Sequence, residues 1–128
     1  MKAVFRLLSG KNLNEREFCF YLNKKIAKTK RKFDIKTKSN RVYCLDDAAI
    51  EIIYPLFTNK KTSIKKSEFL FCLKKELELY SKFKKLKLNF IEYNGLKLKV
   101  SEMLNELEKK HPEIKYSVVN AYLQIKPL

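Results

Sequence analysis

Several residue types that would point to an enzyme are scarce in this chain of 128 residues. It has one histidine, two glycines, three prolines, three cysteines and no tryptophan. With only Gly10 and Gly95, it has no glycine-rich loop of the kind that cradles phosphates. His111 precedes a proline, where it suits a helix end better than general acid or base chemistry. We therefore expect no catalytic residue, no metal and no cofactor, and we predict that the protein is not an enzyme.

The cysteines and the apolar runs point to an intracellular protein. Cys19, Cys44 and Cys72 are widely separated and lack the Cys-x-x-Cys spacing of zinc sites, so we expect three reduced thiols in the core. No stretch approaches the roughly 18 apolar residues that cross a bilayer, and residues 1–10 are too short for a secretory signal. The expected location is the cytoplasm, with no membrane partner.

Acidic residues are scarce relative to basic ones. Lysine and arginine number 29 against 14 aspartates and glutamates, which gives a net charge of +15. Such a charge costs the fold self-repulsion, so the imbalance indicates a polyanionic partner, with nucleic acid preferred over an acidic membrane or protein. An A/T-rich genome would also enrich lysine. Because codon usage does not suppress aspartate and glutamate, the excess still favours a polyanion role.

Hydrophobic residues make up 45% of the chain, which is enough to bury a core. We expect a single compact domain over residues 1–128. Two small units, 1–60 and 61–128, are the alternative. The scarcity of glycine and proline favours long helices, so the predicted fold class is α+β and mostly helical.

Apolar residues at helical spacing predict several helices. One helix is expected near 15–28, where Asn14 and Glu17 have the spacing of a capping box. One long helix is expected near 64–85, with a single apolar stripe facing the core. Asp46 is predicted to cap a third, shorter helix.

Two hairpins are predicted where the apolar residues alternate. The first lies near 33–45 and has a basic tip at Lys38-Ser39-Asn40. The second lies near 86–100, where Asn94-Gly95 is the preferred pair for a tight two-residue turn. Ser101 is then expected to cap a helix that continues through Leu107.

In the last third of the chain, the sequence predicts the helix that begins after Ser101, a tight turn at 111–115 and a second short helix over 116–125. Its segment VSEMLNELEKKHPEIKYSVVNAYL resembles the helix-turn-helix of winged-helix transcription regulators, the ferric-uptake-regulator-like and penicillinase-repressor-like proteins among them. The resemblance lies within residues 96–125, about a quarter of the chain, and implies a winged-helix-like DNA-binding domain. Only residues 126–128 follow, so a wing must come from elsewhere. The regulators' metal ligands have no counterparts here.

In that motif the second helix enters the major groove, so its polar residues are candidate DNA contacts. Lys115, Ser117, Asn120 and Gln124 are expected to face outward. Asparagine and glutamine side chains match the hydrogen-bonding pattern that adenine displays in the major groove. The alternative is a terminal packing helix with ordinary polar residues on its outer side.

A basic segment precedes these elements and is expected to contact phosphates. A second resemblance lies within it: RVYCLDD, residues 41–47, is similar to the wing-to-helix junction of mercury-resistance-type regulators. The candidate backbone contacts are Lys28, Lys30, Arg31, Lys32, Lys36, Lys38 and Arg41.

Taken together, the sequence predicts a sequence-preferring protein that binds double-stranded DNA. The expected role is a transcription regulator, or a replication or accessory factor of a plasmid or phage, with a homodimer or a protein partner as a further expectation. One alternative is a non-catalytic scaffold whose long helix packs on a partner chain. The other is an RNA-binding protein, which would need its tyrosines and phenylalanines exposed on a sheet.

Overall fold

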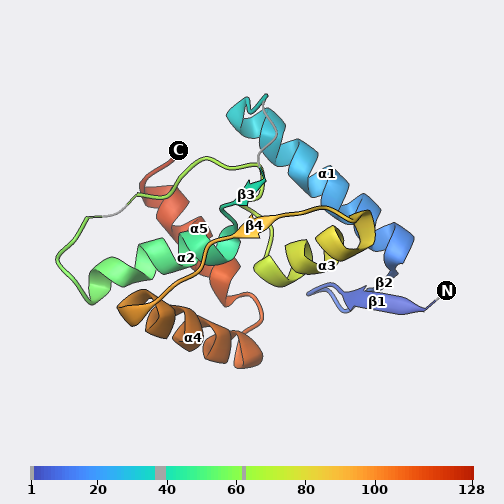
Figure 1. Cartoon of the computed structure of the whole chain (residues 1–128). Helices are drawn as coiled ribbons and strands as arrows, with labels where there is room; N and C mark the ends of the chain where they lie inside the picture. The colour runs from blue at the N-terminus through green and yellow to red at the C-terminus, as the bar shows by residue number, and fades with distance from the viewer. Residues whose placement is uncertain (1, 37–39, 62) are drawn as a thin grey trace.

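The computed structural model describes residues 2–36, 40–61 and 63–128, and its fold is α+β and mostly helical (Figure 1). Two short β-pairs accompany the helices. One is antiparallel, between β1 (Ala3–Arg6) and β2 (Asn12–Asn14), and the other is parallel, between β3 (Arg41–Val42) and β4 (Asn89–Phe90). The helices are α1 (Glu15–Phe33), α2 (Leu45–Ile53), the 3-10 turn η1 (Tyr54–Leu56), α3 (Lys74–Lys84), α4 (Gly95–Lys110) and α5 (Ile114–Ile125).

Helix α1 begins as predicted and ends five residues later than predicted. Asn14 Oδ1 accepts a hydrogen bond from the Glu17 backbone N–H at 2.9 Å, and Glu17 Oε1 accepts one from the Asn14 N–H at 3.0 Å. This confirms the capping box. Phe18 and Leu22 are completely buried, so packing carries the helix into the basic run that follows.

The variant Asn14→Ala should therefore lower the free energy of unfolding by about 1 kcal/mol, because the Glu17 N–H loses its acceptor and the capping box is broken. Urea denaturation measures this loss. Asn14→Asp keeps an acceptor at the cap and should retain most of the stability. Equal losses in the two variants would contradict a capping role.

The predicted hairpin near 33–45 is wrong. Phe33 is the last residue of α1, and β3 pairs in parallel with β4, Arg41 with Asn89 and Val42 with Phe90. Lys38 and Ser39 of the predicted tip lie outside the described residues. Before the tip, Phe33 ends α1 and Ile35 follows the left-handed cap Asp34. Val42 finds its partner 48 residues away because both strands border the same core.

The long helix predicted near 64–85 is reduced to α3. Residues 64–73 instead form turns, including Leu70 N–H to the Ser67 carbonyl at 3.2 Å and Cys72 N–H to the Phe69 carbonyl at 3.0 Å. The side chains of Phe69, Leu70, Cys72 and Leu73 are all buried. A helix with a single apolar stripe cannot bury four of five consecutive residues, so this segment leaves the helical path and passes between the two cores.

The predicted hairpin near 86–100 is also wrong, because α4 starts at Gly95 directly after Asn94. Val100 and Leu104, four residues apart, are buried, whereas Leu96 and Leu98 stay about 40% exposed. The segment is therefore a helix, as the spacing of Val100 and Leu104 indicates, and not the strand that the alternation of Leu96 and Leu98 predicted. Ser101 consequently lies inside α4 and caps nothing. Asp46 is likewise not an N-cap: Cys44 occupies that position of α2.

Two hydrophobic clusters hold the molecule together. The first joins α2, α4 and α5 with Ile64, Leu70 and Leu73, and the second joins α1, α3 and the β1–β2 hairpin with Phe69 and Cys72. In Figure 1 these groups lie on the left and on the right. Each cluster takes residues from both halves of the chain, and the segment 64–73 contributes to both.

The three cysteines are free thiols, as expected. Cys44 and Cys72 are buried, and Cys19 is partly exposed. Burial raises the pKa of Cys72 to about 12, which keeps it in the thiol form. Among the described residues, none of the helices is both long and apolar enough to cross a membrane.

Candidate nucleic-acid interface

Helices α4 and α5 follow one another, joined by residues 111–113, and both pack against α2. Ser117, Asn120 and Gln124 are exposed along the outer side of α5, which confirms their predicted orientation. Their role in reading bases stays a prediction. We call these three residues the α5 edge.

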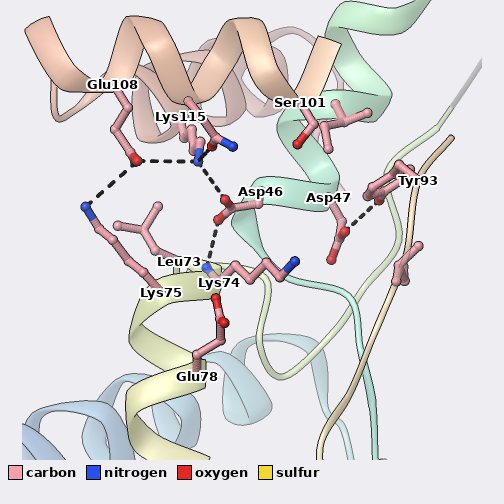
Figure 2. A pocket seen from close by; sticks show the side chains of 13 residues that line it. Asp46, Asp47, Leu73, Lys74, Lys75, Glu78, Tyr93, Ser101, Glu108 and Lys115 are labelled. Atoms are coloured by element: carbon pink, nitrogen blue, oxygen red, sulfur yellow. Dashed lines mark hydrogen bonds and ion pairs between the residues drawn. The ribbon is translucent and has the colours of Figure 1, made fainter. Parts of the chain in front are cut away.

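Lys115 does not face outward, and this corrects its assignment as a DNA contact. Its side chain is 4% exposed, and its Nζ donates to Asp46 Oδ2 at 2.6 Å and to Asn105 Oδ1 at 2.7 Å (Figure 2). Glu108 Oε1 lies 3.5 Å from the same nitrogen. Lys115 therefore ties α5 to α2 and α4. Since it is the only charged residue of α5, the outer side of that helix is neutral.

The network around Lys115 lines a cavity of about 280 Å³ that holds charges of both signs. Lys75 Nζ lies 3.8 Å from Glu108, and the Lys74 backbone N–H donates to Asp46 at 2.8 Å. Burial raises the pKa of Asp47, although hydrogen bonds from the Cys44 backbone N–H and the Tyr93 hydroxyl oppose the rise. Most of these groups pair with one another, although Glu108 Oε2 is buried without a hydrogen-bond partner among the described residues. The network joins α2, α3, α4 and α5, so we assign it a structural role.

A second internal lysine joins the two clusters. Lys25 of α1 donates to the hydroxyls of Tyr116 at 2.8 Å and Tyr21 at 3.0 Å, and lies 3.3 Å from the buried Glu76 carboxylate. Burial alone would lower the pKa of Lys25, but the charge of Glu76 and the contacts with Tyr116 raise it overall. This lysine stays charged and links α1, α3 and α5.

The outer face of α1 carries a row of cations. Lys24, Lys28, Arg31 and Lys32 occupy positions i, i+4, i+7 and i+8, which share one side of a helix, and all four are exposed. The chain has no acidic residue between Glu17 and Asp34. Like charges four residues apart repel by about 0.2–0.5 kcal/mol per pair. Arg31 and Lys32 lie in the last turn, where the helix dipole favours positive charge and offsets part of this repulsion.

A cationic cleft of about 240 Å³ lies beyond the end of α1. Arg41, Lys65, Lys66 and Ser67 line it, together with the ring of Tyr43. Glu68 also lines the cleft, and its carboxylate lies 3.8 Å from Lys30 Nζ. Lys30, a predicted phosphate contact, therefore already has a partner within the chain. We define the basic end as the α1 row, Lys36 and the three cations of the cleft. Its members are Lys24, Lys28, Arg31, Lys32, Lys36, Arg41, Lys65 and Lys66.

Aromatic rings support the lysines of the basic end. Lys32 Nζ lies 5.1 Å from the ring centroid of Phe71, which stacks with Phe33 at 6.2 Å. Lys65 Nζ lies 6.0 Å from the ring centroid of Tyr43. In both pairs the ammonium group itself lies over the ring, a cation–π contact that favours one position of each exposed lysine.

The basic end adjoins α5. Burial raises the pKa of the Tyr43 hydroxyl, and nearby Tyr122 of α5 is among the groups that raise it further. Tyr43, which lines the cleft, and Tyr122 of α5 both pack against the first hydrophobic cluster, so the cleft and α5 share that core. In Figure 1 the C-terminal ends of α1 and α5 both point toward the top. The molecule therefore brings the basic segment and the C-terminal helix to one end, although more than 70 residues separate them in sequence.

Sequence reasoning missed Lys24, Lys65 and Lys66 as members of this surface. Lys24 belongs to the same helical row as Lys28, so its spacing was the available signal. Lys65 and Lys66 were placed on the solvated face of a long helix that does not exist. Lys38 lies outside the described residues.

Comparisons with protein-family models, with curated proteins and with solved structures find no match to this chain. Within the described ranges, no three histidine, cysteine, aspartate or glutamate side chains are placed to hold a metal ion. Any functional assignment must therefore come from the geometry and charge of the surface.

Proposed function

We propose that the protein binds nucleic acid and that the basic end holds the sugar-phosphate backbone. The observation that carries this proposal is the row of four exposed cations on α1. The exposed Asp34 caps the helix after this row, and the cleft cations lie beyond it. Phosphates would relieve the mutual repulsion of these side chains and release condensed counterions, which is the main source of non-specific affinity.

The preferred ligand is double-stranded DNA, read by the α5 edge. Asn120 and Gln124 are neutral, exposed and chemically suited to adenine in the major groove. Their helix follows α4 after a short connection, the order of helices on which the resemblance to winged-helix regulators rests. The proposed role is that of a sequence-preferring transcription regulator, or of a plasmid or phage replication or accessory factor.

Surface aromatic residues favour a duplex over RNA bound on a sheet. In the part of the chain that the structure describes, the sheets have two strands each, and Phe20 and Phe57 are the aromatic residues that are more than half exposed. They lie on α1 and after η1, outside either sheet. A β-sheet platform for stacking unpaired bases is therefore lacking in the described residues.

The variant Asn120→Ala/Gln124→Ala tests the reading role. Fragments of the source genome selected for binding provide a preferred site, and fluorescence anisotropy then compares that site with unrelated duplex. Removing each bidentate hydrogen-bonded pair should reduce discrimination by about 1–3 kcal/mol, roughly 5- to 150-fold, while the salt dependence stays unchanged.

The matched control is Asn12→Ala/Asn59→Ala, which removes two exposed asparagines far from α5 in sequence. This variant should keep both the preference and the salt dependence. If the α5 variant discriminates as well as the unmodified protein, α5 is not the reading helix, although backbone binding by the basic end would still stand.

A further inference from the structure

The outer side of α4 carries an apolar stripe that nothing in the described chain covers completely. Leu96, Met103 and Leu107 are between 37% and 40% exposed, although each is a large apolar residue. Positions i, i+7 and i+11 lie on one side of a helix, next to the buried Val100. The stripe runs along nearly the whole length of α4.

The charge around this stripe differs from that of the rest of the molecule. Helix α4 contains three glutamates and four lysines, a net charge of +1, so the rest of the chain carries +14. Helix α4 forms the lower edge of the molecule in Figure 1, away from the C-terminal end of α1 at the top. A second molecule of the same high positive charge therefore meets only a small excess of positive charge on α4 itself.

We propose that α4 is the contact surface for a second copy of this chain, with the two α4 helices antiparallel about a two-fold axis at Met103. Such an interface uses the same residues on both sides, so the stripe of one copy covers the stripe of the other. In this register Lys99 lies level with Leu107 of the second copy and beside its Glu106. Each contact occurs twice.

Lys99 and Glu106, which flank the stripe, can pair with each other only between copies. Lys99 and Glu106 are seven residues apart, about 10 Å along the helix axis, too far to pair within one chain. Glu106 is held by Lys109 at 2.8 Å, but both side chains are more than 70% exposed. An exposed pair of this kind contributes little, so Glu106 can exchange its partner on dimerisation.

Sedimentation equilibrium without nucleic acid tests the proposal. The unmodified protein should form a concentration-dependent dimer, and Met103→Glu should be monomeric over the same range because two carboxylates would be buried at the axis. Lys99→Glu should also be monomeric, since it faces Glu106 of the second copy. The double variant Lys99→Glu/Glu106→Lys should recover the dimer.

Recovery by the charge swap cannot come from the fold, because residues 99 and 106 do not meet within one chain. The control Phe20→Glu alters an exposed apolar residue on α1 and should leave the dimer unchanged. Circular dichroism verifies that every variant is folded. A monomer at all concentrations, a dimer that survives Met103→Glu, or a charge swap that fails to recover the dimer would each overturn the proposal. None of these results bears on DNA binding by the basic end.

Discussion

Reversing three charges on α1, in the variant Lys24→Glu/Lys28→Glu/Arg31→Glu, should weaken binding to duplex DNA by at least about 100-fold at physiological salt. These side chains lie in one exposed row and are the densest group of cations on a single helix face of the basic end. The reversal removes attraction to phosphates and adds repulsion. The fold should persist, because the row makes no contribution to either hydrophobic cluster.

Salt dependence distinguishes the removal of phosphate-binding side chains from a general change of net charge. The slope of log affinity against log salt should become shallower by about 0.9 for each phosphate that the variant no longer neutralises, or about 2.7 for three. The matched control is Lys82→Glu/Lys84→Glu/Lys87→Glu, which makes the same change in net charge at the end of α3 and beyond it.

The control should lose affinity only modestly and keep the slope. Fluorescence anisotropy with one labelled duplex at several salt concentrations measures both quantities, and circular dichroism verifies the folding of both variants. If the α1 reversal and the control behave alike, binding depends on overall charge and the basic end is not a specific surface.

Removing the buried lysine of α5 should have the largest effect on stability. Lys115→Ala takes the nearest cation from the Asp46 and Glu108 carboxylates, 16% and 14% exposed, and leaves Glu108 only Lys75 at 3.8 Å. Breaking a buried ion pair from one side costs about 3–5 kcal/mol, since the remaining charge is desolvated without compensation. Urea denaturation should show this loss as a lower midpoint.

The surface lysine Lys110 serves as the comparison. Lys110→Ala lies at the exposed end of α4 and should change the free energy of unfolding by less than about 0.5 kcal/mol. Under conditions in which both variants are folded, Lys115→Ala should bind duplex DNA as tightly as the unmodified protein. A stable Lys115→Ala variant that no longer binds DNA would return Lys115 to the set of DNA-binding residues and contradict its structural role.

The elements that follow from local signals were predicted well. The Asn14 and Glu17 capping box involves four consecutive residues, and α1 starts where that box places it. Helix α5 begins two residues before its predicted start, and its outer edge follows from helical periodicity. Such features depend on hydrogen bonds and side-chain directions within a few residues, so the local sequence is enough to predict them.

The errors occurred where a segment supports two periodicities or has its partner far away. Leu96 and Leu98 alternate with polar residues, but the helical pair of Val100 and Leu104 found a core to bury against. Val42 pairs with Phe90, a contact that no local pattern encodes. The inward direction of Lys115 had one available signal: it lies four residues before the buried Val119 and so on the same face of α5.

By itself the sequence determined the positive excess, the predominance of helices and the neutral outer edge of α5. Only the tertiary structure decided which cations face water. Lys25 and Lys115 turn inward because the fold brings Glu76 and Asp46 to them, 51 and 69 residues away in sequence. The α1 row and the cleft lysines become one surface because the segment 64–73 crosses between the two cores. A charge buried beside its counterion is stable only when distant segments supply that counterion, so its direction is a property of the assembled fold.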